Sequence, residues 1–211
     1  MKQGSEVWVR VREKAKLITK ELIHHAPFTA FGAFTGIIVT LLAVHLSQNA
    51  SGVIFHTLHP IHILLSALVT AGMFRLYKGK GVALFLIGYT GSVGICTISD
   101  ILVPYFGGTL LGAEMEFHLC FIEEWWLVNP LALLGILIAY RSPTTKFPHA
   151  GHVLVSTWAS LFYLIAFGST INWSLIPPFL FVILFSSVWV PCCTSDIIFP
   201  LLFVRESNNN L

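Results

Sequence analysis

Two copies of a histidine motif and two copies of an aspartate motif occur in this chain. The histidine motif, H-x-x-H-x-x-x-S, occupies residues 59–66 and again residues 149–156. The aspartate motif reads CTISDILVP over residues 96–104 and CCTSDIIFP over residues 192–200. Imidazole and carboxylate groups bind divalent transition metals and move protons. Because both copies stand in apolar sequence, where ionisable side chains are costly, the duplication predicts metal or proton chemistry.

The spacing within each motif places its polar side chains on one helix face. Histidines three residues apart share a face, and so do a cysteine and an aspartate four residues apart. The simpler interpretations are histidines bonded to lipid headgroups and aspartates bonded between helices. The two cysteines of the aspartate motifs are interpreted as small packing residues rather than ligands. The candidate ligands of the two copies are His59, His62 and Asp100, followed by His149, His152 and Asp196.

The elements that must position these residues are membrane helices. Of the 211 residues, 55% are hydrophobic and 10% are charged, and the mean hydropathy is +0.80, which is typical of a polytopic membrane protein. About 20 apolar residues cross a bilayer as a helix. Six segments have this character, and they cover residues 27–47, 53–77, 82–105, 121–140, 148–172 and 176–204.

The basic residues give this arrangement a direction. All twelve Lys and Arg residues fall on one side of six spans, and the opposite connections, 48–52 and 106–120, contain none. The positive-inside rule therefore predicts an integral membrane protein with both termini in the cytoplasm. Residues 1–26 are predicted to form a basic, amphipathic cytoplasmic segment, and residues 205–211 a disordered tail.

The repeat predicts the architecture of the spans. Each copy contains three spans, an odd number, so the second copy must run inverted relative to the first. The first repeat, with an acidic outer connection, covers residues 27–120, and the second covers 121–204. The predicted fold is therefore all-α, with six transmembrane helices as two inverted three-helix repeats. Aligning residues 30–37 with 129–136 also superposes the polar pair 24–25 on the polar pair 123–124.

Sorting the candidates by side predicts two clusters, one near each face of the bundle. A rise of about 1.5 Å per residue puts His59 about 9 Å inside its span and Asp100 about 7 Å inside its own. The two clusters are then too far apart for inner residues to contact an outer ion. The outer cluster is His59, His62, Asp100, Glu123 and Glu124, and the inner cluster is His24, His25, His149, His152 and Asp196.

The outer connection contributes two further candidates. Glu114 and His118 stand four residues apart, so a short helix would present both to one ion. A solvated connection is the competing interpretation. His45 and His56 have no counterpart in the other half, so they are interpreted as interfacial residues.

The leading functional hypothesis is a divalent transition-metal transporter, because inverted repeats can exchange conformations and give alternating access. The alternative is a membrane-embedded metal or dimetal enzyme acting on a lipid, quinone or other apolar substrate, with Glu123 or Glu124 as general base. A third is a structural, proton-conducting or sensor protein that binds no metal. Whether the protein is an enzyme stays open here.

The ligand types also indicate the partners. Zinc and iron suit histidine and carboxylate ligands best, followed by manganese, cobalt, nickel and copper. The expected partners are the bilayer and the metal ion. Nucleic acid is not expected, and homo-oligomerisation stays open. The feature that separates a transporter from an enzyme is whether the two clusters connect.

Overall fold

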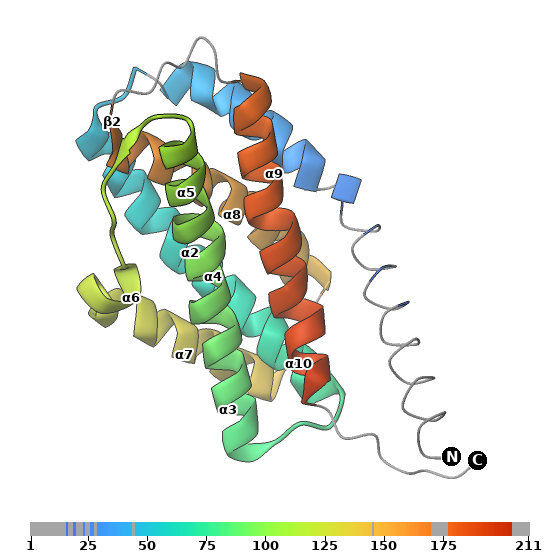
Figure 1. The fold of residues 1–211 in the computed structure, drawn as a ribbon. Helices are drawn as coiled ribbons and strands as arrows, with labels where there is room; N and C mark the ends of the chain where they lie inside the picture. The colour runs from blue at the N-terminus through green and yellow to red at the C-terminus, as the bar shows by residue number, and fades with distance from the viewer. Residues whose placement is uncertain are drawn as a thin grey trace, which may run out of the picture.

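The computed structural model describes residues 16, 19, 23, 26–27, 29–43, 45–144, 146–169 and 177–203, without the side chains of 146–150, 177, 193 and 197. The described chain is mostly helical (Figure 1). After a first helix, Thr29–Ala43, the elements are α2 (Gln48–Leu76), α3 (Gly81–Tyr89), η1 (Thr90–Gly94), α4 (Ile95–Thr97), η2 (Ile98–Leu102), α5 (Val103–Leu110), β1 (Glu114–Met115), α6 (Cys120–Glu123), α7 (Trp125–Arg141), α8 (Lys146–Phe167), β2 (Gly168–Ser169), α9 (Pro177–Cys193), η3 (Thr194–Ile198) and α10 (Phe199–Leu202).

Three of these helices are long and apolar enough to cross a membrane. They are Gln48–Leu76, the continuous helix Gly81–Leu110 that runs from α3 to α5, and Pro178–Leu202. Their length and composition indicate membrane association. Shorter apolar helices at Thr29–Ala43, Trp125–Arg141 and Gly151–Phe167 match the other three predicted segments.

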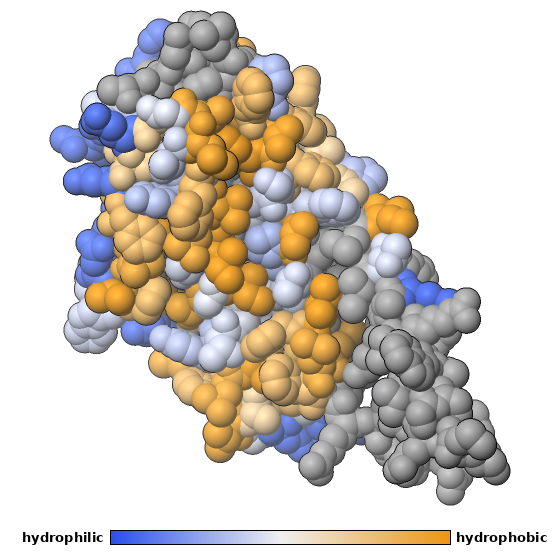
Figure 2. Space-filling view, in the orientation of Figure 1, coloured by the Kyte–Doolittle hydropathy of each residue, from blue (hydrophilic) through white to orange (hydrophobic). Residues whose placement is uncertain are grey.

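Many large apolar side chains lie on the surface of the described molecule. Apolar side chains cover much of the face seen in Figure 2, and the most hydrophilic residues lie along its left and lower edges. Large apolar side chains are exposed on several helices, including Leu42 at 75%, Val82 at 73% and Leu110 at 88%. Contiguous apolar surface of this kind suits a lipid environment rather than water.

Helix α2 is the element around which the others pack. It contacts α7 and α8 along much of their length, while the α3–α5 helix and the α9–α10 helix run side by side across them (Figure 1). The buried core between these helices includes Phe55 and Ile63 of α2 and Leu161 and Tyr163 of α8, all with 0% exposure. The polar side chains of His59, His62, Ser66 and Thr70 on α2 are buried in the same interior.

Gly135 allows α7 to approach the backbone of α2. A Cβ atom there would meet the carbonyl oxygen of Leu64 and would lie 2.9 Å from Ala67 Cβ. We expect Gly135→Ala to destabilise the protein by about 1–3 kcal/mol, because overpacking forces the helices apart. Gly52→Ala, on α2 with no atom within 4 Å of the added methyl group, is the control. It should be neutral or stabilising by up to about 1 kcal/mol. Thermal unfolding in detergent measures both, and equal melting temperatures would contradict this packing.

Both aspartate motifs form π-helical turns. Asp100 lies in η2 and Asp196 in η3, and the two turns occupy equivalent positions of the duplicated motif. Pro104 and Pro200 each follow their aspartate by four residues. Because proline has no N–H, it leaves the aspartate carbonyl without its ordinary helical partner, which favours a locally widened helix. Such π-turns are frequent at functional sites.

Candidate metal centre

The Asp100 carboxylate lies at the centre of a buried hydrogen-bonded group. Its Oδ2 atom accepts from His59 Nδ1 at 2.8 Å and from His62 Nδ1 at 2.7 Å. Its Oδ1 atom accepts from Ser156 Oγ at 2.8 Å. All four side chains are 0–1% exposed. One carboxylate thus joins η2 to α2 and to α8.

These bonds fix the direction in which the histidines present their lone pairs. A carboxylate only accepts hydrogen bonds, so His59 and His62 donate through Nδ1. In the neutral imidazole, Nε2 then carries the free lone pair. Metal-binding histidines commonly donate their other ring nitrogen to a carboxylate in this way. The Nε2 atom of His59 is buried and has no hydrogen-bond partner among the described residues.

The second motif copy meets the first in the same place. His152 Nδ1 lies 3.1 Å from Asp196 Oδ2, and both side chains are 0% exposed. The ring of His152 stacks on that of His62, with centroids 5.2 Å apart and planes 8° apart. The histidine–aspartate pairs of the two copies therefore form one centre, which we call the central site.

The predicted separation of these residues into an outer and an inner cluster is wrong. Helix α2 begins at Gln48 and the α3–α5 helix ends at Leu110, both about five residues beyond the predicted ends. His59 therefore lies about 16 Å from the start of its helix and Asp100 about 15 Å from the end of its own, at about 1.5 Å per residue. That depth brings Asp100 into contact with the α8 residues of the second copy.

The contacts between the two motif copies occur in equivalent pairs. Ser66 Oγ lies 3.1 Å from Ser195 Oγ, and Ser156 Oγ lies 2.8 Å from Ser99 Oγ. Ser66 is equivalent to Ser156, and Ser99 to Ser195, so the same contact is made twice with the copies exchanged. The same exchange relates two further bonds, Thr70 Oγ1 to Ser195 O at 3.3 Å and Ser160 Oγ to Ser99 O at 3.2 Å.

Two buried thiols complete the central site. Cys96 Sγ lies 3.5 Å and Cys192 Sγ 3.8 Å from His62 Nε2. The ligand atoms of His62, His152 and Cys192 lie within 4.8 Å of one another, and so do those of His59, His62 and Asp100. Either group could hold a metal ion.

Tetrahedral geometry distinguishes the two groups. Around a tetrahedral zinc ion, a nitrogen and a sulfur ligand atom lie about 3.6 Å apart. Two nitrogen or oxygen ligand atoms lie about 3.3 Å apart. The distances from His62 Nε2 to the two thiols, 3.5 and 3.8 Å, are close to the first value. The Asp100–histidine distances, 2.7 and 2.8 Å, are hydrogen-bond lengths and are shorter than the second. The geometry thus favours imidazole and thiol groups as the metal ligands. The carboxylates would then contact the histidines and not the ion.

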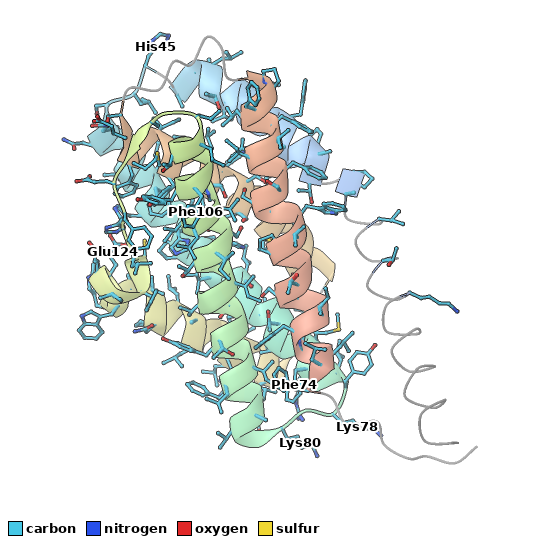
Figure 3. All side chains as sticks on the ribbon, in the orientation of Figure 1. His45, Phe74, Lys78, Lys80, Phe106 and Glu124 are labelled. Atoms are coloured by element: carbon cyan, nitrogen blue, oxygen red, sulfur yellow. The ribbon has the colours of Figure 1, made fainter. Side chains whose placement is uncertain are left out.

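A second group of ligand types lies nearer the surface. His56, His118, Cys120 and Glu124 place one ligand atom each within 4.8 Å of the others. Burial raises the pKa of the Cys120 thiol above its usual range. The sequence predicted His118 and Glu124 here, but not His56 or Cys120. We call this group the peripheral site; Glu124 marks its position in Figure 3.

The other candidates of the outer connection have different roles. Glu123 bonds His118, with Oε2 2.8 Å from Nδ1, so it lies behind the peripheral site. The predicted helix presenting Glu114 together with His118 is wrong. Glu114 lies in β1, opposite Ser169 of β2, because backbone pairing with 168–169 keeps this segment extended. Glu114 is exposed and belongs to none of the ligand groups of the described chain.

Three predicted residues are not placed. His24 and His25 lie outside the described residues, and the side chain of His149 is not described, although its backbone begins α8.

The fold and the two sites define a helical protein with membrane-compatible apolar helices and histidine, aspartate and cysteine groups that could hold a metal. Comparisons of the chain with protein-family models, with curated proteins and with solved structures found no match.

Proposed function

We propose that this protein is an integral membrane transporter for a divalent transition metal, built from two inverted three-helix repeats, 27–120 and 121–204. The paired contacts support the repeat. Each serine contact has an equivalent with the copies exchanged, and both aspartates lie in equivalent π-turns. Inverted repeats that exchange conformations open a shared site alternately to each side.

The observation that carries the proposal is the meeting of the two histidine–aspartate pairs. In a transporter, the residues of the two halves must form one continuous site. Two isolated clusters would give the ion no connected route. His62 and His152, the second histidines of the two motifs, stack directly on each other. Asp100 and Asp196 flank this stack and are fully buried, which is the arrangement expected of an occluded state in the proposed transport cycle.

A line of polar side chains on α2 supports a route to this site. His56, His59, His62, Ser66 and Thr70 follow one another at intervals of three or four residues, which is one helix face. The line begins at His56, whose side chain is 30% exposed, and continues to residues with 0–1% exposure. At about 1.5 Å per residue it covers about 21 Å, most of a bilayer's hydrocarbon thickness.

The ligand set gives the proposed cargo. His62, His152 and Cys192 offer two imidazoles and one thiolate, a combination that suits zinc and disfavours magnesium, calcium and manganese. Asp100 and Asp196 orient the histidines and supply negative charge against that of the ion. We therefore propose zinc as the preferred ion, with cobalt(II) as its spectroscopic substitute.

The test of this function is zinc uptake by proteoliposomes containing a zinc-sensitive dye, driven by a pH gradient or a membrane potential. Protein-containing vesicles should accumulate zinc faster than protein-free vesicles and should not accumulate manganese. Protein that binds zinc but never moves it, under either driving force, would favour the membrane-embedded enzyme. Protein that does neither would leave a structural or proton-conducting role.

The proposed orientation places both termini in the cytoplasm. Figure 3 supports it, because Lys78 and Lys80 lie at the opposite end of the bundle from His45. Positive residues mark the cytoplasmic side.

Cysteine labelling tests this orientation at exposed positions of a chain whose native cysteines are replaced by serine. A membrane-impermeant maleimide added from outside should label Gln48→Cys and Glu116→Cys. It should label Lys80→Cys and Ser142→Cys only after the membrane is permeabilised. Outside labelling at Lys80→Cys would overturn the proposed orientation.

A further inference from the structure

The peripheral site joins two parts of the chain that are distant in sequence. His56 comes from the third turn of α2, while His118, Cys120 and Glu124 come from the connection between α5 and α7. That connection contains little regular structure, only β1 and the single turn of α6. A ligand bound to all four side chains would fasten the connection to α2.

Polar atoms of this site are buried without hydrogen-bond partners. Among the described residues, none is found for His118 Nε2 or Glu124 Oε2. His56 Nδ1 already faces the same carboxylate, 2.7 Å from Glu124 Oε1. Buried polar atoms are nearly always bonded, so atoms that converge without partners indicate a missing shared partner.

The surroundings of His118 hold its ring in the orientation that a metal ligand needs. Glu123 Oε2 lies 2.8 Å from His118 Nδ1, and a carboxylate this close favours the tautomer with its proton on Nδ1 and its lone pair on Nε2. Glu123 is itself fixed, because its Oε1 accepts from Leu119 N at 3.0 Å. Phe167 stacks on the His118 ring at 5.0 Å and 12°. Nε2 is thereby turned towards Glu124, whose Oε1 lies 3.8 Å away.

We propose that His56, His118, Cys120 and Glu124 form a second metal site of the zinc class, separate from the central site. Two imidazoles, a thiolate and a carboxylate are all zinc ligands, and four protein ligands close a tetrahedral site. A closed site retains its ion, whereas a transit site must release it. The peripheral ion therefore holds the α5–α7 connection against α2, beside the exposed end of the polar line that starts at His56.

This site goes beyond the proposed function and does not depend on it. A protein that binds zinc here and transports nothing would still have a fastened connection. Equally, a protein could transport zinc through the central site with the connection free.

Cobalt(II) spectroscopy of the purified full-length protein tests the site directly. The variant carries serine at Cys96, Cys192 and Cys193, so Cys120 is its remaining thiol. Cobalt(II) should produce the visible bands of tetrahedral cobalt and a thiolate-to-cobalt charge-transfer band. Adding Cys120→Ser should abolish the charge-transfer band. Absence of the band before that change would overturn the proposal.

Metal stoichiometry in the otherwise native chain gives a second test that does not need the triple variant. Glu124→Gln should reduce bound cobalt by one ion per chain. Glu116→Gln, an exposed carboxylate in the same connection, is the matched control and should leave the count unchanged. Equal counts for both variants would contradict the site.

Limited proteolysis then tests the fastening of the connection. Zinc should slow cleavage within residues 111–119 of the native chain at least tenfold, and Cys120→Ser should remove this protection. Protection that persists in Cys120→Ser would show that the ion does not act through this site.

Discussion

Replacing His62 by alanine is expected to reduce zinc flux about 100-fold or more. This reduction corresponds to an increase of about 2.7 kcal/mol in the free-energy barrier to transport. His62 contacts an aspartate of its own motif copy and a histidine and a cysteine of the other copy. Its Nδ1 donates to Asp100, its ring stacks on His152, and its Nε2 faces Cys96 and Cys192. No neighbouring side chain can replace all of these contacts.

The assay for this variant is zinc uptake by proteoliposomes at equal protein density. His45→Ala, an exposed histidine outside the ligand groups of the described chain, is the control and should transport normally. His152→Ala should be as damaging as His62→Ala. This reverses what two separate clusters would imply, namely that inner-cluster changes leave outer binding intact. Near-native flux through His62→Ala in folded protein would exclude the central site as the route.

The second large effect is expected from Asp100→Asn, which keeps the shape of the side chain and removes its charge. Asp100 accepts bonds from His59, His62 and Ser156. An amide presents N–H groups to one side, so it cannot accept from donors on both. If the amide oxygen takes the position of Oδ2, it still accepts from both histidines, but without the negative charge that strengthens these bonds, and Ser156 must turn to accept from the amide N–H. If the amide takes the opposite orientation, both histidines lose their acceptor. Loss of such an outer-shell partner costs about 10–100-fold in metal affinity.

Competition with a chelator of known affinity measures this change in the purified protein. Asp196→Asn should weaken binding within the same range, because Asp196 occupies the equivalent position beside His152. Glu116→Gln removes a carboxylate charge at an exposed site and should leave the affinity unchanged. Native affinity in folded Asp100→Asn would mean that the carboxylate serves only helix-to-helix bonding.

The duplicated motifs predicted that His59 and His62 meet Asp100 and that His152 meets Asp196, but not that these pairs form one site, nor that Glu123 and Glu124 lie in a different group. The predicted span began at residue 53, after a predicted connection at residues 48–52. In the structure the helix begins there, since Ser47 Oγ accepts from Ala50 N as an N-cap. The predicted third span likewise ended at residue 105, but the helix continues through the glycine pair at residues 107–108 to Leu110. The pair permits close packing there, because a Cβ at Gly107 would lie 2.9 Å from Ile183.

The ligands that sequence reasoning missed share a physical explanation. A buried cysteine in apolar sequence has the size of a packing residue, so composition alone does not identify it as a ligand. The usable signal was position, because Cys96 and Cys192 both precede an aspartate by four residues. Among the described residues of the second half, no ligand group equivalent to the peripheral site is found. A search guided by the repeat therefore passes over His56, and only the folded chain brings it to Cys120.

The serine contact between Ser66 and Ser195 has a consequence for how the protein is made. These residues are 129 positions apart, and synthesis proceeds from the N-terminus. In the proposed topology, the first three spans enter the bilayer while Ser195 is still unsynthesised. Polar groups that later bond across the halves then meet lipid or the insertion machinery without their partners. The newly synthesised first half is therefore the intermediate most exposed to membrane quality control. Insertion of the last helix supplies the missing partners and ends that exposure.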